Sequence, residues 1–156
     1  MGNERTCTDL ALNSLKLTKV SVSVLKEAVR GGKLEIQFTG EIQTADETTV
    51  DKDRLGRLEL TVALAGMERT GTESASEPEK AFEVIGTMVG TFRPKEGTSF
   101  SADEFSDCYD WISPQVYLPL REYLSYTLEK IGVRITLPLA VPLINQSEAN
   151  RAQGVR

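Results

Sequence analysis

The sequence predicts an α+β protein, with a four-stranded antiparallel sheet followed by a long helix that packs on one face of the sheet. Four segments between residues 15 and 92 alternate apolar and polar side chains, which is typical of strands with one face on a core and the other in water. After residue 100, apolar residues recur at helical spacing instead. Because the strands precede the helices, we expect the helices on one side of the sheet. The 156 residues fit one domain, with flexible tails expected at 1–12 and 145–156.

The first two predicted strands differ in the regularity of their alternation. Residues 15–25 (LKLTKVSVSVL) place three valines on one face, while Leu15 and Leu17 are one step out of phase. A β-bulge near Thr18–Lys19 would bring all five side chains to one side. Residues 33–42 (KLEIQFTGEI) alternate without interruption and predict a second strand with water on one side.

The third and fourth predicted strands are residues 57–66 and 81–92, joined by a long polar loop. Gly86 and Gly90 share the phase of the apolar residues in the fourth strand. Glycine inside a strand often marks the close approach of another backbone. We therefore expect the helix that follows to lie across the fourth strand at these two positions.

Two helices are predicted after the sheet. Residues 101–111 form a short helix with Ser101 as N-cap, and the acidic residues behind it are explained by their place in the first turn. The main helix is expected to carry Pro119 in its first turn, where the missing N–H costs nothing. Gly132 is expected to end it as a C′ glycine.

The composition argues against several classes of function. A net charge of −5 does not suit nucleic acid or an anionic membrane surface, both of which favour clustered Lys and Arg. The chain has no histidine, which is the most common general base and zinc ligand. It also has no nucleophile–base pair, phosphate-binding loop or metal-ligand spacing. We therefore expect neither catalytic residues nor a metal or other cofactor.

The cysteines and the N-terminus predict a cytoplasmic protein. Cys7 and Cys108 form neither a CxxC pair nor a disulfide framework, so we expect free thiols, with Cys108 a small buried side chain. The polar N-terminus is not that of a signal peptide. No stretch is long and apolar enough for stable insertion into a membrane.

Residues 137–144 (LPLAVPLI) combine two prolines with five Leu, Val or Ile side chains. Proline lacks the N–H that a helix interior or a central strand requires. Leaving these aliphatic side chains in water would forfeit roughly 1.5–3 kcal/mol each. We expect an extended segment with one side on the sheet–helix body and the other side forming the wall of a groove.

From Ala81 onward the chain resembles the SecB family of bacterial cytosolic chaperones. Three pieces carry the resemblance: residues 81–92 (AFEVIGTMVGTF), residues 112–128 (ISPQVYLPLREYLSYTL) and the Leu/Pro-rich segment after the main helix. In the second piece, Pro119 is followed shortly by Arg121–Glu122. The first 80 residues resemble the family only in their strand pattern.

The resemblance implies a fold, an assembly and a role. It implies dimers formed through the first strand and the main helix, and pairing of dimers into a homotetramer. It also implies an ATP-independent chaperone that binds unfolded or precursor polypeptides in apolar grooves, and SecA as a partner in protein export. Some relatives serve a toxin–antitoxin pair instead.

The outer face of the predicted sheet departs from the family pattern. The resemblance implies acidic residues for docking SecA on this face, in strands one and four. The first strand here has none, and the fourth has Glu83 but places Ile85 where the family has its second acid. These residues weigh against SecA. The alternative is an adaptor for one dedicated protein partner, such as a toxin–antitoxin-associated chaperone.

Seven side chains are candidates for polypeptide binding. Aromatic side chains offer a large contact area at little cost in rotamer entropy, and an extended segment can line a groove with alternate residues. The competing interpretation is a core or a subunit interface, which we favour for the leucines taken alone. Arg121–Glu122 is expected to form a structural or interface salt bridge and to have no catalytic role. The candidates are Trp111, Tyr117, Tyr123, Leu137, Leu139, Val141 and Leu143.

Overall fold

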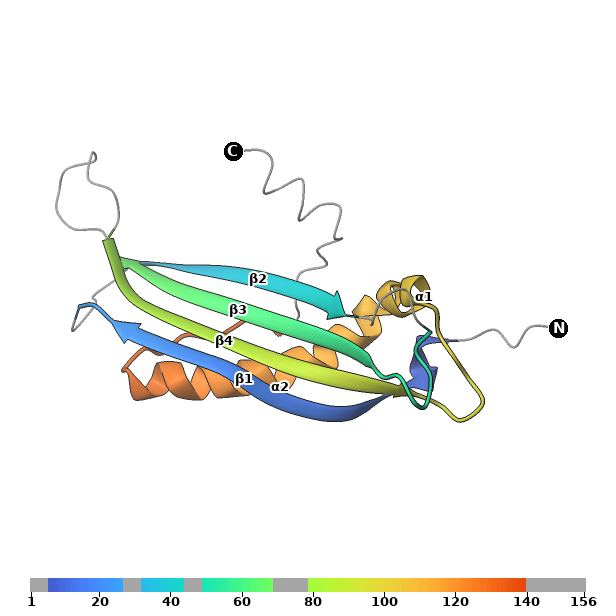
Figure 1. Cartoon of the computed structure of the whole chain (residues 1–156). Coiled ribbons are helices and arrows are strands. Elements are labelled where there is room, and N and C mark those ends of the chain that lie inside the picture. The colour runs from blue at the N-terminus through green and yellow to red at the C-terminus, as the bar shows by residue number, and fades with distance from the viewer. Residues whose placement is uncertain (1–5, 27–31, 44–48, 69–78, 140–156) are drawn as a thin grey trace, which may run out of the picture.

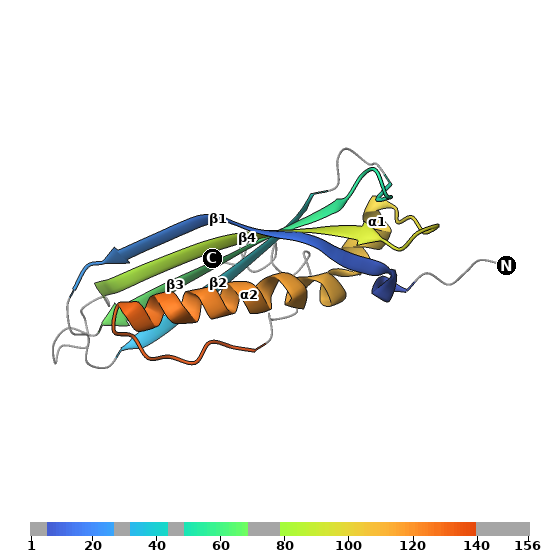
Figure 2. The same ribbon diagram turned by 90° about the horizontal axis from the view of Figure 1, so that it is seen from below.

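The computed structural model describes residues 6–26, 32–43, 49–68 and 79–139, and Figure 1 shows them as a long sheet backed by a helix. The four strands are antiparallel in the order β1-β4-β3-β2, so β1 and β2 are the edge strands. The predicted α+β fold is confirmed, because α2 packs along one face of this sheet (Figure 2). The elements are β1 (Leu10–Val24), β2 (Lys33–Gln43), β3 (Gly56–Glu68), β4 (Glu79–Pro94), α1 (Ala102–Asp107) and α2 (Tyr109–Lys130).

Strand β1 starts earlier than the predicted first strand. It begins at Leu10 instead of Leu15, and a short 3-10 helix, η1 (Cys7–Asp9), comes directly before it. Leu10 is buried, so part of the expected N-terminal tail belongs to the packed structure. The pairing of β1 with β4 shifts register between Leu17 and Lys19. This shift confirms the bulge that the out-of-phase leucines predicted.

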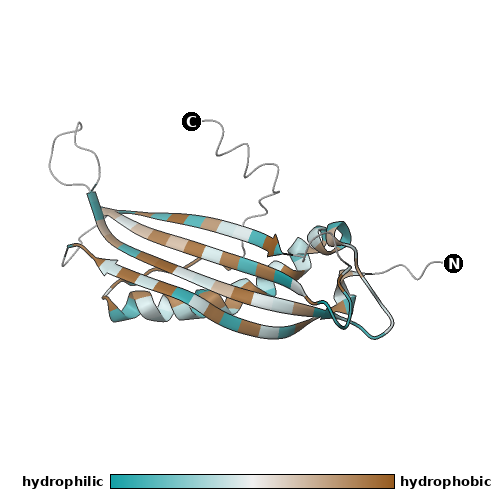
Figure 3. Cartoon of the chain, viewed as in Figure 1, coloured by the Kyte–Doolittle hydropathy of each residue, from teal (hydrophilic) through white to brown (hydrophobic). Residues whose placement is uncertain are grey.

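The remaining strands follow the predicted alternation, which Figure 3 shows as hydrophobic and hydrophilic residues in turn. We call the face toward α2 the inner face and the opposite one the outer face. The predicted loop between β3 and β4 lies mostly outside the described residues, as does the tail at 145–156. The inner face of β3 contributes Leu58, Leu60, Val62 and Leu64 to the core.

Helix α2 lies across β4 at the two glycines that predicted its position. A Cβ atom built at Gly86 would lie 3.0 Å from Leu120 Cδ1 and 3.0 Å from Leu124 Cδ2. At Gly90 it would lie 2.5 Å from Val116 Cγ2, closer than side chains tolerate. The absence of side chains on this stretch of β4 therefore lets the helix approach the sheet closely, as predicted.

The prediction that Pro119 occupies the first turn of the main helix is wrong. Helix α2 begins at Tyr109 and contains both Pro114 and Pro119 in its interior. Each proline removes one backbone hydrogen bond of the helix. Burial along the whole length of α2 offsets this cost, because helices in proteins are stabilised mainly by packing of one face. The buried residues are Ile112, Ser113, Val116, Tyr117, Leu120, Leu124 and Leu128.

Both helices have the predicted caps. The Ser101 hydroxyl accepts from the Glu104 N–H at 3.1 Å, and Ser101 N–H donates to the Glu104 carboxylate at 3.3 Å, which makes a capping box. Gly132 has a φ of 83° and donates to the Glu129 carbonyl at 3.0 Å. The next residue, Val133, donates to Leu128 at 2.9 Å, which completes a Schellman motif. The chain can therefore reverse directly behind α2.

Candidate functional site

The chain behind α2 runs back along the helix (Figure 2), and we call residues 133–139 the return segment. Two α2 side chains hold its backbone. The Tyr117 hydroxyl donates to the Pro138 carbonyl at 2.5 Å. Arg121 donates to the Leu137 carbonyl from Nε at 3.1 Å and from Nη2 at 3.0 Å. These bonds fix the position of a segment that has no strand or helix pairing of its own.

The return segment presents one buried and one exposed leucine. Leu137 is 2% exposed and belongs to the core, whereas Leu139 is 73% exposed. This agrees with the prediction of a segment that rests on the protein with one side and is open on the other. The predicted continuation at Val141 and Leu143 lies outside the described residues.

Tyr117 does not line an open surface, contrary to prediction. It is 1% exposed, and its ring packs edge-on against Phe38 of β2 with centroids 5.7 Å apart. Burial raises its pKa above the ordinary value for tyrosine, and the neighbouring Arg121 opposes this shift. The salt bridge expected between Arg121 and Glu122 is not among the ion pairs of the described residues. Tyr117 and Arg121 instead support the return segment through hydrogen bonds to its backbone.

A cavity of about 740 Å³ opens where the end of α2 and the return segment face the ends of β1, β2 and β3. Its walls combine apolar side chains with cationic ones, among them Lys26, which pairs with Glu68 at 3.4 Å and also with Glu79. The hydrogen bond with Glu79 is the main cause of the raised pKa of Lys26. The cavity combines five separate chain segments, one from each of the four strands and one from the end of α2 with the return segment, so no single sequence motif marked it. Its lining includes Leu34, Met67, Phe82, Ile131 and Ile135, with Lys26, Lys33 and Arg134.

A second apolar surface follows the inner side of edge strand β1. Five β1 side chains that alternation directs toward the core remain 37–50% exposed. Tyr123, also exposed, lies about 120° around α2 from Tyr117, on the flank toward β1. We call this surface the β1–α2 face. It comprises Leu12, Leu15, Val20, Val22, Val24, Tyr123 and the exposed Tyr126.

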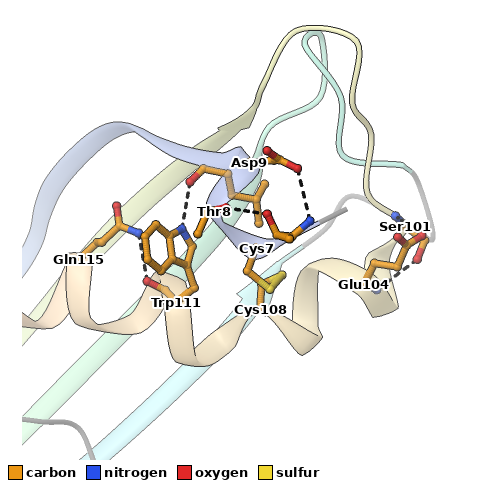
Figure 4. The surroundings of a disulfide bond; sticks show 10 residues. Cys7, Thr8, Asp9, Ser101, Glu104, Cys108, Trp111 and Gln115 are labelled. Atoms are coloured by element: carbon orange, nitrogen blue, oxygen red, sulfur yellow. Dashed lines mark hydrogen bonds between the residues drawn. A yellow bond between two sulfur atoms is a disulfide. The ribbon is translucent and has the colours of Figure 1, made fainter. Parts of the chain in front are cut away.

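Trp111 lies at the start of α2, close to the beginning of β1 (Figure 4). Its indole Nε1 donates to the Leu10 carbonyl at 3.1 Å, while the side chain stays 42% exposed. It is therefore a partly buried anchor for β1. Of the predicted binding residues that the structure describes, some lie in the core, some on the return segment and some on the β1 side, and these described residues do not line one common groove.

The prediction of free thiols is wrong, because Cys7 and Cys108 form a disulfide (Figure 4). Their Cα atoms are 5.4 Å apart although the residues are separated by 101 positions in sequence. The tertiary fold places η1 beside the junction of α1 and α2 and so brings the two cysteines together. Cys108 is buried, as predicted.

Glu83 and Ile85 lie on the outer face of the sheet, as their phase in β4 predicted. Ile85 is opposite Ser21 of β1 and Ala63 of β3 in the sheet register. Glu83 pairs with Lys80 on the same strand at 2.5 Å. On the outer face of β4, Glu83 is thus a neutralised carboxylate with the apolar Ile85 two residues further along the strand.

Two further properties of the described residues bear on function. They contain no group of three or more His, Cys, Asp or Glu side chains arranged to hold a metal ion. No helix within them is both long enough and apolar enough to cross a bilayer.

Comparison with known proteins supports the architecture. No family model matches the sequence, and no curated protein matches it either. Among solved structures, the fold is similar to the SecB-like chaperone Rv1957 of Mycobacterium tuberculosis, in complex with a ChAD peptide from the Rv1956 HigA1 antitoxin. The TM-score is 0.66 at 11% sequence identity, over 88% of this chain and 95% of that chain. The chain therefore has a SecB-like fold, a four-stranded antiparallel sheet followed by a long helix on one face.

Proposed function

We propose that this protein is an ATP-independent cytoplasmic chaperone that binds unfolded or precursor polypeptides along the return segment. One observation carries the proposal: Leu139 is 73% exposed on a segment whose backbone is tied to α2 by Tyr117 and Arg121. The backbone contacts keep this large aliphatic side chain in water, and binding of an apolar ligand would bury it.

The surroundings of the return segment suit an extended client. Edge strand β2 has one edge that β3 does not pair, and such an edge can accept a further strand. The cavity beside Ile135 can take apolar side chains of the client. Pro138 keeps the return segment from pairing at that position. Val141 and Leu143 would extend the same wall.

We infer that two copies of the chain associate through the β1–α2 face. Its apolar side chains lie on an edge strand and on the exposed flank of α2, so a second copy related by a two-fold axis would cover both faces at once. Pairing of such dimers gives the homotetramer that the resemblance implies. Client binding and self-association then use different sides of α2.

A second candidate function is that of an adaptor for one dedicated partner. The neighbouring structure holds a peptide from an antitoxin. The outer face, with Glu83 paired to Lys80 and Ile85 beside it, weighs against SecA as partner in export. An adaptor would bind one protein tightly and ignore unfolded chains in general.

Aggregation of several chemically unfolded model proteins, followed without nucleotide, tests the proposal. The protein should suppress aggregation at stoichiometric amounts, and Leu139→Asp should remove this activity. Thr136→Asp is the matched control, because Thr136 is an exposed polar residue of the same segment.

Native mass spectrometry with and without client reports assembly in the same samples. Loss of both holding and oligomer in Leu139→Asp would assign the return segment to the subunit interface. Failure of the unmodified protein to hold any client, with one dominant partner in a pull-down, would favour the adaptor.

A further inference from the structure

We propose that the Cys7–Cys108 disulfide is a reversible redox clamp that controls how firmly the start of β1 is held against α2. The pair connects η1 to the single residue between α1 and α2 (Figure 4). It links the 3-10 helix directly before edge strand β1 to the N-cap residue of α2, the helix that flanks the β1–α2 face. The inference rests on the cytoplasmic location proposed above, because in that compartment such a bond is typically regulatory rather than structural.

The clamped segment is a small unit that can open alone. The register of β1 against β4 shifts between Leu12 and Ser14, so residues 10–12 form a short pairing that is offset from the rest of the strand. Besides the disulfide, this unit is held by the burial of Leu10, by its short pairing with β4, by the Trp111 bond to Leu10 and by the Lys95 N–H, which donates to the Asp9 carbonyl at 2.7 Å. Local opening of such terminal units is common, and a covalent tether limits it.

The two cysteine residues differ in exposure. Cys7 is partly exposed, whereas Cys108 is 3% exposed. A low-molecular-weight thiolate, such as glutathione, can therefore attack Cys7 Sγ. The S–S electron pair then leaves with Cys108 Sγ, which takes up a proton, and Cys7 carries a mixed disulfide. A second thiolate attacks the glutathione sulfur, which releases Cys7 as thiolate and forms oxidised glutathione. Oxidised glutathione drives the same steps in reverse.

Reduction loosens the end of the β1–α2 face where Leu12 lies. The β1–α2 face keeps the same side chains in both states. In the oxidised protein the start of β1 is fixed in place, and in the reduced protein it opens locally. The consequence for assembly rests on the self-association proposed above: the oxidised form associates more tightly than the reduced form. The clamp itself does not depend on that association.

Hydrogen exchange measured by mass spectrometry tests the clamp on full-length protein equilibrated with oxidised or reduced glutathione. Intact mass first establishes the state of the two cysteines. In the reduced protein, amides in the peptide covering residues 6–14 should exchange several-fold faster, with β3 unchanged. Emission from Trp111, the only tryptophan of the chain, should shift together with this exchange.

Cys7→Ser is the matched control. It should exchange at the rate of the reduced protein in both glutathione mixtures, and Cys108→Ser should confirm this result if it folds. Absence of the disulfide in oxidised glutathione, or equal exchange of residues 6–14 in both states, overturns the proposal. Faster exchange upon reduction in a protein that is monomeric in both states supports the clamp and contradicts the proposed assembly.

Discussion

The two edge strands carry the same alternating pattern and end in different environments. On β2, the inner side chains Leu34, Ile36 and Phe38 are partly buried and pack against the core. On β1, the equivalent Val20 and Val22 remain 40% and 42% exposed. An alternating pattern shows that a strand has one apolar face to be buried. It does not show whether the same chain or a second molecule buries that face.

The cover on the β2 side comes from the chain itself. Tyr117 packs on Phe38 and holds the return segment. Tyr109 lies over Gly40, where a Cβ atom would be 2.7 Å from its hydroxyl oxygen. On the β1 side, α2 reaches the strand near Trp111 and Leu10 and leaves the valines half exposed. The chain thus covers the inner face of β2 itself and leaves the inner face of β1 half exposed, which is the surface that we propose for self-association.

The largest expected effect comes from removing one aromatic ring on the covered edge. Phe38→Ala should lower the free energy of unfolding by about 3 kcal/mol, because it leaves a cavity against Tyr117. Val22→Ala, its counterpart on the open edge, should cost less than about 1 kcal/mol in the monomer. Urea unfolding at concentrations below self-association measures both. Equal losses would mean that the two edges are packed alike.

A charge on the open edge should act on assembly. Val22→Asp should weaken self-association by about 2 kcal/mol, or roughly 30-fold, because an unpaired carboxylate would be buried between subunits. Ser21→Asp is the control, since Ser21 is the neighbouring residue on the outer face. Analytical ultracentrifugation compares the two variants. If Ser21→Asp dissociates the oligomer and Val22→Asp does not, the outer face is the interface.

Loss of one hydroxyl should loosen the cover of the β2 edge. Tyr117→Phe removes the hydrogen bond to the Pro138 carbonyl and should cost about 1 kcal/mol of unfolding free energy. Faster hydrogen exchange is expected in residues 133–139, with no change in β1. Tyr126→Phe, at an exposed position of the same helix, is the control. Unchanged exchange of the return segment would show that Arg121 alone holds it.

The smallest expected effect is a decrease in the free energy of unfolding at alkaline pH, caused by two tyrosines on the β2 side of the sheet. Burial raises the pKa of Tyr109, with the Asp110 charge adding to the shift, and burial also raises the pKa of Tyr117. The folded state therefore keeps these protons longer than the unfolded state. The stabilisation is complete below the unfolded pKa of about 10 and is lost as pH rises through the folded values.

Urea midpoints between about pH 9 and pH 11 should fall less steeply in the Tyr109→Phe, Tyr117→Phe double variant than in the unmodified protein. Lysines that titrate in the same range contribute equally to both proteins. An unchanged slope would contradict the role of the two phenols.

Much of the fold was predictable because it depends on local patterns. The bulge in β1 followed from two out-of-phase leucines, and the position of α2 over β4 followed from Gly86 and Gly90. The start of α2 was not predictable, because proline inside a helix is tolerated only where burial of the surrounding residues compensates. The candidate site was predicted in part: the exposed Leu139 is found, but Tyr117 is buried.

Alternation, capping residues and glycine phase thus established the strands, the helix ends and the face on which the helix packs, since each depends on residues close together in the chain. Three features depended on contacts between distant segments. They are the Cys7–Cys108 bond, the hydrogen bonds that tie the return segment to α2, and the choice of which edge strand the chain covers. No local pattern encodes the distance between residues 101 positions apart, so these features emerged only when the chain was folded.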